Sequence, residues 1–587
     1  MPFRPALGIS DFRALREEGA GYIDKTRFIA QVLAEPTEVL LFPRPRRFGK
    51  TLNLSTMRYF LEKRPEDLSP LFEDLAIWRD PAARAHFQRY PVIFVSFKDV
   101  RSSTWESTFR FIQLVLQDLC RDHRDALASG LLPPDEQRDF DQILAGTATE
   151  EQCALSLRRL SALLHRVHGE KAVLLIDEYD TPIHAGFQHG FLDPVVQFFR
   201  GFFSAALKDN TALFRGVLTG ILRVSRESLF SGLNNVIVHS ILRPEPATSI
   251  GFATSFGFTE AEVRAITEAD AHPGLLDELR AWYDGYLFGG ETIYNPWSIL
   301  NYIYHHRQLG SYWVNTSSND LIYDLVVQRG LGLSGDMERL LTGGTIDTRI
   351  DESLVFRDLT QRSDSLWSFL LFTGYLKPVA LRATDTGLEA SLAVPNREVM
   401  HAFRDVFALW MERGLNDRER IDALLRSLLR GDAEELEARL EQLLLTAMSF
   451  HDAAGRDPEK LYHGFILGLL VQLEGRYEVR SNRESGFGRA DVLVRPRQPG
   501  QPGVVLELKV PRHRGGETPE QALVAAAKQV RDRRYAEDLR AAGADPVHEL
   551  VAVFDGKRAW VKTVDDALAE GPGSGPTSPG SGPISPA

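Results

Sequence analysis

The stretch RPRRFGKT at residues 44–51 has the residue types of a phosphate-binding loop. It follows the apolar run EVLLF at 38–42 and precedes a stretch with the composition of a helix. A strand, a tight loop and a helix N-terminus together direct backbone N–H groups and the positive end of a helix dipole at one point, which suits a phosphate. Gly49 permits close approach of the backbone, Lys50 can reach the terminal phosphates, and the Thr51 hydroxyl can hold Mg²⁺.

One residue departs from the usual signature of such a loop, G-x-x-x-x-G-K-S/T, because Arg44 occupies the first glycine position. On this stretch alone, an arginine-rich surface turn followed by a helix explains the residues as well as a phosphate loop does. A second feature is therefore needed to decide between the two interpretations.

Two acids at the end of another apolar run supply that feature. The segment VLLIDEYD at 173–180 predicts a buried strand that ends in Asp177 and Glu178. Asp177 can hold the shell of a Mg²⁺ ion, and Glu178 can polarise an attacking water. An apolar strand ending in Asp-Glu is by itself usually an ordinary strand boundary. In this order, and on strands that we expect to be neighbours, the two motifs together favour a nucleotide site.

A third apolar run ends at Thr219 and is followed by TGILRVSRESLFSGLNN. A polar residue at that strand tip can sense the γ-phosphate of a nucleotide, and Arg223 is close enough in sequence to contribute charge. A helix cap followed by a surface helix explains the same residues equally well.

A charged pair on an apolar strand marks a second candidate site near the C-terminus. In GFGRADVLV and VVLELKV, side chains alternate along each strand, so Glu507 and Lys509 share one face. If the two strands pair through the turn RQPGQPG, Asp491 approaches that face. Two carboxylates can hold one or two hard cations, which activate a water that a lysine orients. The alternative is an edge strand whose Glu and Lys face solvent.

Bulk composition limits the class of protein. A chain of 587 residues is too long for one core, which predicts about two to four domains. The net charge of −12 means that any nucleic-acid contact must use a local groove. The two cysteines, Cys120 and Cys153, cannot form a disulfide framework or a four-thiolate zinc site. No apolar stretch approaches the roughly 18 residues of a membrane helix, so we expect a cytoplasmic protein.

Apolar runs alternate with helical segments along the chain, and these elements must position the candidate residues. Such runs predict an α/β domain with a parallel sheet at 1–245. Residues 246–450 predict a mostly helical region, in which WYDGYLFGG and YNPWSI are expected to be packing corners. The alternative is that these aromatic stretches transmit nucleotide state to the C-terminal domain. Residues 451–570 predict a compact mixed α/β domain, and the tail at 571–587 is expected to be disordered. The expected strands are 38–42, 91–97, 172–177 and 213–219.

Taken in order, the motifs resemble bacterial AAA-ATPase-like proteins that carry a C-terminal PD-(D/E)XK nuclease-like domain. They are GYIDKTRFI, RPRRFGKT, LLIDEYDTPI, TGILRVSRESLFSGLNN, WYDGYLFG, YNPWSI and YWVNTSSNDLI. In that family RPRRFGKS or RPRRFGKT is the usual form of the loop, so Arg44 fits it. The resemblance implies a P-loop NTPase fold with ATP and Mg²⁺ as cofactors. The implied nucleotide-binding residues are Arg46, Arg47, Gly49, Lys50, Thr51, Asp177, Thr219 and Arg223, with Thr51 and Asp177 on the metal and Glu178 catalytic.

The C-terminal residues resemble the D…ExK core of PD-(D/E)XK nucleases. Asp491, Glu507 and Lys509 match the core, and Gln529 with Tyr535 matches the family's Q…Y pattern. The resemblance implies Asp491, Glu507, Lys509 and Gln529 as catalytic residues and the two acids as metal ligands. Further candidates are Glu459, His463 and Glu484. Five arginines add positive charge near this site, which either follows a phosphate backbone or is only solvated. They are Arg489, Arg495, Arg497, Arg512 and Arg514.

Together these features predict an ATP-binding and ATP-hydrolysing switch that is coupled to a Mg²⁺-dependent DNA endonuclease domain. We expect no membrane partner, and a homo-oligomer is possible. A non-catalytic, ATP-regulated scaffold or nucleic-acid-binding protein with a degenerate nuclease fold is the alternative. A metabolic phosphotransferase ranks last, because no acceptor-binding motif is evident in the sequence.

Overall fold

The computed structural model of the chain divides into two compact units. The first comprises Met1–Leu325 and Thr345–His401, and the second comprises Val326–Gly344 and Ala402–Ala587. Residues 246–450, the expected connector, contribute to both. The structure describes residues 3–222, 229, 233, 235–242, 251–268, 274–313, 325, 334–341, 343–352, 356–360, 362–385, 387–404, 418–447, 458–470, 473, 475–485, 488–511 and 516–569.

A parallel sheet with the strand order β2-β3-β4-β1-β5 forms the centre of the first unit. The four apolar runs of the sequence are confirmed as strands, and a short strand is added at the edge. The strands are β1 (Val39–Pro43), β2 (Val92–Ser96), β3 (Ala172–Asp177), β4 (Leu213–Gly220) and β5 (Val236–Val238).

One expectation about this sheet is wrong. The strand before the RPRRFGKT loop is β1, and the strand that ends at Asp177 is β3. They are not neighbours, because β4 lies between them. Phe42 pairs with Thr219, and Ser96 pairs with Asp177, so the strands end at one edge of the sheet. The order therefore places Thr219 between the loop and Asp177. Ligand sites in open parallel sheets lie outside such carboxyl ends.

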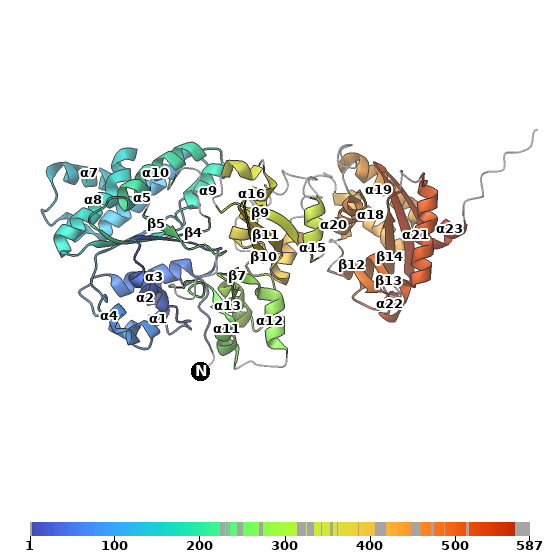
Figure 1. Cartoon of the computed structure of the whole chain (residues 1–587), viewed down its shortest axis with the longest axis horizontal. Coiled ribbons are helices and arrows are strands. Elements are labelled where there is room, and N and C mark those ends of the chain that lie inside the picture. Colours follow the sequence, from blue (N-terminus) through green and yellow to red (C-terminus); the bar gives the residue numbers. More distant parts are fainter. Residues whose placement is uncertain are drawn as a thin grey trace, which may run out of the picture. The chain divides into compact units, whose positions relative to one another are not determined.

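Helices cover both faces of this sheet (Figure 1). Figure 1 shows α1 (Phe12–Glu17), α2 (Arg27–Ala34) and α3 (Lys50–Leu61) on one face. The other face carries α5 (Trp105–Asp122), α8 (Glu150–His168) and α10 (Leu192–Leu207). Four phenylalanines of α10 recur at helical spacing and are buried, which anchors this layer: Phe198, Phe199, Phe202 and Phe203. Smaller helices are α4 (Pro81–Arg84), α6 (Arg124–Leu127), α7 (Pro134–Ala145) and α9 (Thr181–Gln188).

The two cysteines, Cys120 on α5 and Cys153 on α8, are free and buried. Burial raises the pKa of both thiols to about 12, so they pack as small hydrophobic residues. Among the helices that the structure describes, none is long and apolar enough to cross a bilayer.

The rest of the first unit contains strands as well as the expected helices. One small sheet has the order β6-β8-β7 and another has the order β10-β11-β9. The strands are β6 (Phe258–Thr259), β7 (Tyr286–Phe288), β8 (Glu291–Tyr294), β9 (Ile346–Ile350), β10 (Lys377–Thr384) and β11 (Gly387–Ala393). The helices are α11 (Glu260–Thr267), α12 (Leu275–Tyr283), α13 (Pro296–Tyr304) and α16 (Ser363–Thr373). These strands are short or largely exposed, so their sequences lack a clear alternating pattern.

The aromatic stretch WYDGYLFGG forms a tight packing corner, as the sequence indicated. Gly285 has φ 101°, and a Cβ at this position would lie 2.4 Å from the carbonyl oxygen of Pro395, so only glycine fits. The rings of Tyr286 and Phe288 pack against Phe48, with centroids 4.9 and 5.1 Å apart. The corner therefore contacts the RPRRFGKT loop directly.

The second unit contains a mixed sheet with the order β12-β13-β14-β15-β16. Its strands are β12 (Tyr477–Ser485), β13 (Gly488–Pro496), β14 (Gly503–Lys509), β15 (Val547–Asp555) and β16 (Arg558–Thr563). β14 is antiparallel to β13, as expected, and parallel to β15. Two consecutive helices, α21 (Pro519–Arg533) and α22 (Ala536–Ala541), follow β14 in the chain, and Arg534, with φ 56°, ends the first of them.

The remaining helices of this unit are α15 (Ser334–Leu341), α18 (Arg418–Arg430), α19 (Ala433–Ala447), α20 (Pro458–Leu470) and α23 (Val564–Ala569). Small residues of α21 pack on the sheet and form part of the core around β14 and β15: Ala522, Ala526 and Ala527. The tail at 571–587 lies outside the described residues.

Candidate functional site

The RPRRFGKT loop joins β1 to the N-terminus of α3. Gly49 is the N-cap of this helix and has φ 82°, a left-handed conformation that a side chain would strain. Lys50 and Thr51 then form the first turn, whose N–H groups have no partner within the helix. The local sequence therefore builds a strand, a tight loop and a free helix N-terminus, the arrangement that a phosphate site needs.

Lys50 lies over this loop. Its side chain is almost completely buried, and its Nζ donates hydrogen bonds to the carbonyl oxygens of Arg44, at 3.0 Å, and Pro45, at 2.8 Å. Burial lowers the pKa of Lys50, and the charges of Glu178 and Asp177 oppose that shift. The ammonium is thus held at the loop by two carbonyl groups that cannot neutralise it.

Asp177 is the centre of a hydrogen-bonded group at the strand ends. The Thr51 hydroxyl donates to Asp177 Oδ2 at 2.7 Å, and the Thr219 hydroxyl donates to Asp177 Oδ1 at 2.6 Å. Asp177 is fully buried, and burial raises its pKa. Carboxylate and hydroxyl oxygens suit a hard cation such as Mg²⁺, so the donor set fits the implied metal.

Glu178 follows directly in a turn between β3 and α9. It has φ 51°, which is uncommon for a residue other than glycine and is found more often at functional sites. Its Oε2 accepts a hydrogen bond from the Thr181 hydroxyl at 3.1 Å, and the residue lines the same cavity as Lys50. Glu178 therefore lies where a base for water could act.

Among the arginines of the loop, Arg44 holds the backbone in place. Its side chain is buried, donates to the carbonyl oxygens of Pro43 and His239, and packs over the ring of Phe256. Its packing explains how the loop tolerates an arginine in place of the first glycine.

Arg46 and Arg47 line the cavity, and the guanidinium of Arg47 lies 4.3 Å from the ring centroid of Trp297. The third arginine candidate of this site, Arg223, lies outside the described residues.

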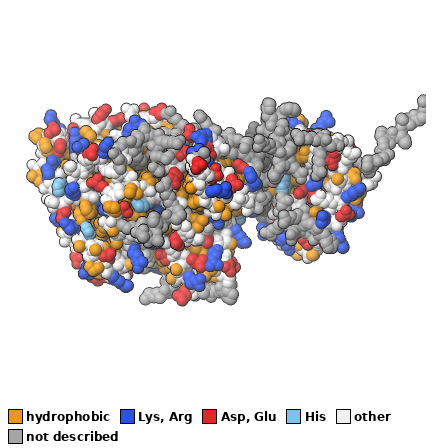
Figure 2. Space-filling model, in the orientation of Figure 1, with side chains coloured by type: hydrophobic (Ala, Val, Ile, Leu, Met, Phe, Trp, Pro, Cys, Tyr) orange, Lys and Arg blue, Asp and Glu red, His pale blue; other side chains and the backbone are white. Residues whose placement is uncertain are grey.

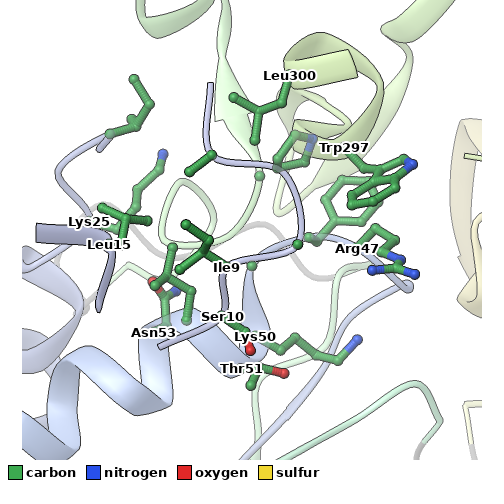
Figure 3. Close-up of a pocket in the computed structure, with 18 of the residues that line it drawn as sticks. Ile9, Ser10, Leu15, Lys25, Arg47, Lys50, Thr51, Asn53, Trp297 and Leu300 are labelled. Carbon is green, nitrogen blue, oxygen red and sulfur yellow. The ribbon is translucent and has the colours of Figure 1, made fainter. Parts of the chain in front are cut away.

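The cavity at this loop has a volume of about 610 Å³, within the range of roughly 300–1,000 Å³ typical of small-molecule sites. Figure 3 shows Arg47 and Trp297 on one side of it and Leu15 and Lys25 on the other. Sequence reasoning missed its apolar wall, which comes from segments far apart in the chain. The wall includes Phe3, Ile9, Ile23, Phe258 and Leu300.

Lys25 also lines the cavity, and it lies in the GYIDKTRFI motif. Its Nζ contacts both carboxylate oxygens of Glu262 at 2.7 Å and the carbonyl oxygen of Thr254 at 2.8 Å. With its ammonium neutralised by Glu262, Lys25 ties the N-terminal segment to α11.

The C-terminal candidates converge on β13 and β14. Lys509 Nζ lies 3.2 Å from Glu507 Oε1 and 3.9 Å from Asp491 Oδ2. The backbone N–H of Leu508 donates to Asp491 Oδ2 at 2.9 Å, and the Gln529 side chain on α21 donates to Glu507 Oε1. Asp491, Glu507, Lys509 and Gln529 thus form one cluster.

The electrostatics of this cluster centre on Glu507, which is fully buried. Burial raises the pKa of Glu507 to about 7, the charge of Asp491 adds to the increase, and Lys509 opposes it. A cation between the two acids would favour the ionised form. Among the described residues, no group of three or more metal-ligating side chains gathers anywhere. Two carboxylates nevertheless fit Mg²⁺, which usually takes its other ligands from water and phosphate.

The other C-terminal candidates lie next to this cluster, form other pairs or fall outside the described residues. His463 on α20 contacts the backbone carbonyl of Asp491 at 3.0 Å, and Tyr535 is buried. Arg495 makes an ion pair with Glu478 at 3.7 Å. On the face shown in Figure 2, basic and acidic side chains are interspersed. Outside the described part of the chain lie the side chains of Glu459, Glu484 and Arg489 and the whole of Arg512 and Arg514.

Comparison with known families agrees with the two clusters. Residues 6–230 match the family described as predicted AAA-ATPase, and residues 457–564 match the PD-(D/E)XK nuclease superfamily. The chain therefore carries an AAA-ATPase-like domain and a C-terminal domain of the PD-(D/E)XK nuclease superfamily, as the resemblance implied. It is also similar to an uncharacterized protein in the vnfD 5′ region of Azotobacter chroococcum mcd 1. The identity is 27% over 570 residues, covering 93% of this chain and 96% of the relative.

Proposed function

We propose that this protein is an ATP-hydrolysing switch coupled to a Mg²⁺-dependent nuclease domain that acts on DNA. The observation that carries the proposal is the group formed by Lys50, Thr51, Asp177 and Thr219 at the edge of a cavity large enough for a nucleotide. In this proposal 1–245 is the ATPase-like domain, 246–450 is the lid and connector, and 451–570 is the nuclease-like domain.

In the ATP site, each residue has a role that follows from its position. The N–H groups after Gly49 and the ammonium of Lys50 bind the phosphates. Thr51 and Asp177 would hold Mg²⁺, which neutralises charge on the phosphates. Glu178 accepts a hydrogen bond from the attacking water, and Thr219 orients the carboxylate of Asp177.

Replacing Thr219 by valine should lower kcat for ATP hydrolysis about tenfold, equivalent to about 1.4 kcal/mol. Valine keeps the volume of threonine but cannot donate to Asp177 Oδ1, and hydrogen bonds to charged groups contribute about 1.5–3 kcal/mol. Steady-state phosphate release measures the effect. Thr267→Val is the matched control, because Thr267 is also buried and its hydroxyl donates within α11, to the carbonyl oxygens of Val263 and Arg264. An unchanged kcat for Thr219→Val would assign Thr219 to packing alone.

In the nuclease site, Asp491 and Glu507 would hold Mg²⁺, which lowers the pKa of a bound water. Lys509 orients that water and stabilises the charge that develops on the phosphate as one P–O bond forms and another breaks. Gln529 keeps the Glu507 carboxylate in place through its hydrogen bond. The charge of the Lys509 ammonium also reduces the repulsion between the two acids.

In this proposal the nucleotide bound in the ATP site changes the activity of the nuclease site. The γ-phosphate of ATP can shift a conformational equilibrium by its contacts in one state. Cleavage of DNA should therefore differ by at least about fivefold between ATP and ADP, a typical coupling for linked sites. Lys50→Ala should remove the difference. Equal cleavage rates with ATP, with ADP and without nucleotide would contradict the coupling.

A second candidate function is a non-catalytic, ATP-regulated scaffold. The burial of Glu507 favours it, because this carboxylate is inaccessible to solvent and already contacts Lys509 and Gln529. A scaffold would change its particle size with nucleotide, in light scattering, and would cleave no DNA with any divalent metal.

A further inference from the structure

A tight turn after β2 presents charged side chains beside the ATP site. Phe97 and Val100 are buried and anchor the turn, and the ring of Phe97 packs against Phe199 with centroids 5.1 Å apart. The N–H of Val100 donates to the carbonyl oxygen of Phe97 at 3.0 Å. The turn is also tied to the acidic strand end, because the N–H of Phe97 donates to the carbonyl oxygen of Asp177 at 3.0 Å. Its position relative to Asp177 is therefore fixed.

The residues between and after these anchors are exposed. Lys98, Asp99 and Arg101 line the same cavity as Lys50 and Glu178. Within the part of the chain that the structure describes, the guanidinium of Arg101 makes no ion pair or side-chain hydrogen bond. An anchored turn that directs a cation without a counterion into a cavity is suited to an anionic ligand.

The neighbouring charges strengthen this argument. Arg46 lines the cavity too, and the charge of Arg101 contributes to lowering the pKa of Arg46, after burial. The repulsion that the charge of Arg101 exerts on Arg46 is relieved when an anion binds beside the two guanidinium groups. Cationic side chains outnumber acidic ones around this end of the cavity, which holds Arg46, Arg47, Lys50, Lys98 and Arg101 against Asp99 and Glu178.

We propose that Arg101 contacts the terminal phosphate of ATP, beside Arg46, and makes the site discriminate ATP from ADP. The inference rests on the proposed ATP-binding function. Arginine suits this role because its planar guanidinium can donate two hydrogen bonds to phosphate oxygens. The turn after β2 thereby becomes a third element of the site, with the loop before α3 and the end of β3.

The test compares the affinities of Arg101→Ala for ADP and for a non-hydrolysable ATP analogue, both with Mg²⁺, by titration calorimetry on the full chain. The ATP analogue should bind about tenfold more weakly, which corresponds to the loss of one charge-assisted contact. The affinity for ADP should stay within about twofold of the wild type, as expected for a surface substitution. Arg101→Lys, which keeps the charge, should recover part of the difference.

Arg110→Ala is the matched control, because Arg110 is exposed on α5 and does not line the cavity. It should bind both nucleotides like the wild type. If Arg101→Ala weakens ADP and the ATP analogue equally, or changes neither, the inference is overturned. Arg101→Gln keeps a polar side chain with part of the stem but no charge, and it replaces the alanine variant in the comparison if that variant melts at a lower temperature.

Failure of this inference is distinguishable from failure of the proposed function. If the wild type binds nucleotide and Lys50→Ala does not, an unchanged Arg101→Ala overturns only the role of Arg101. If the wild type binds neither nucleotide, the proposed function fails, and the role of Arg101 fails with it.

Discussion

Lys50→Ala is expected to weaken ATP binding about 100-fold, the largest effect of any substitution in the N-terminal domain. Among the residues that the structure describes, the buried ammonium of Lys50 donates hydrogen bonds to the carbonyl oxygens of Arg44 and Pro45. A phosphate would give it the negative partner that these carbonyls do not supply. Loss of a charge-assisted contact in a buried site costs about 3 kcal/mol, which is roughly a factor of 100 in affinity.

Equilibrium binding of a fluorescent ATP analogue, with and without Mg²⁺, measures this effect. Lys171→Ala is the control, because Lys171 is exposed just before β3 and lies outside the cavity. Lys50→Met keeps the packing of the aliphatic stem, and both Lys50 variants should retain the melting temperature of the nucleotide-free protein within a few degrees, about 1 kcal/mol of unfolding free energy. Undiminished ATP affinity in both would refute the assignment of the site.

The sequence predicted the parts of this site but not how they are assembled. The strands were evident because continuous apolar runs are typical of strands buried on both faces. The order of strands was not evident, since apolar runs carry no information on which strand lies between two others. Thr219 was therefore assigned to a strand tip without its contact to Asp177, which the insertion of β4 between β1 and β3 creates.

The apolar wall of the cavity shows a second limit of sequence reasoning. Ile9, Ile23 and Leu300 come from separate segments, and none has a neighbour in the sequence that indicates a ligand. Arg101 is a different case. A charged residue after a strand is usually only solvated, so its position in the sequence did not indicate a contact with a ligand. Only the folded arrangement distinguishes these residues from ordinary core and surface positions.

The C-terminal cluster was more predictable, because alternation along β14 by itself puts Glu507 and Lys509 on one face. Pairing of β13 with β14 then brings Asp491 to them, as expected. The complete burial of Glu507 could not be predicted, since it depends on the packing of other elements, including α21, around that strand.

Glu507→Gln and Lys509→Ala should each lower metal-dependent DNA cleavage by at least about 1,000-fold, or about 4 kcal/mol in the activation free energy. Glutamine has the shape of glutamate but no charge for a cation, and removal of Lys509 leaves the two acids without their ammonium.

Binding of the metal provides a readout that does not depend on activity. Mg²⁺ or Mn²⁺ should raise the melting temperature of the wild type, since a ligand of the folded state stabilises it, and should not raise that of Glu507→Gln. Glu520→Gln, an exposed change in the first turn of α21, should retain both the cleavage and the metal-induced shift. Equal cleavage by the wild type and both site variants would mean that a contaminating nuclease is responsible. A metal-induced shift that survives in Glu507→Gln would place the cation elsewhere, because two carboxylates at β13 and β14 cannot hold it when one of them has lost its charge.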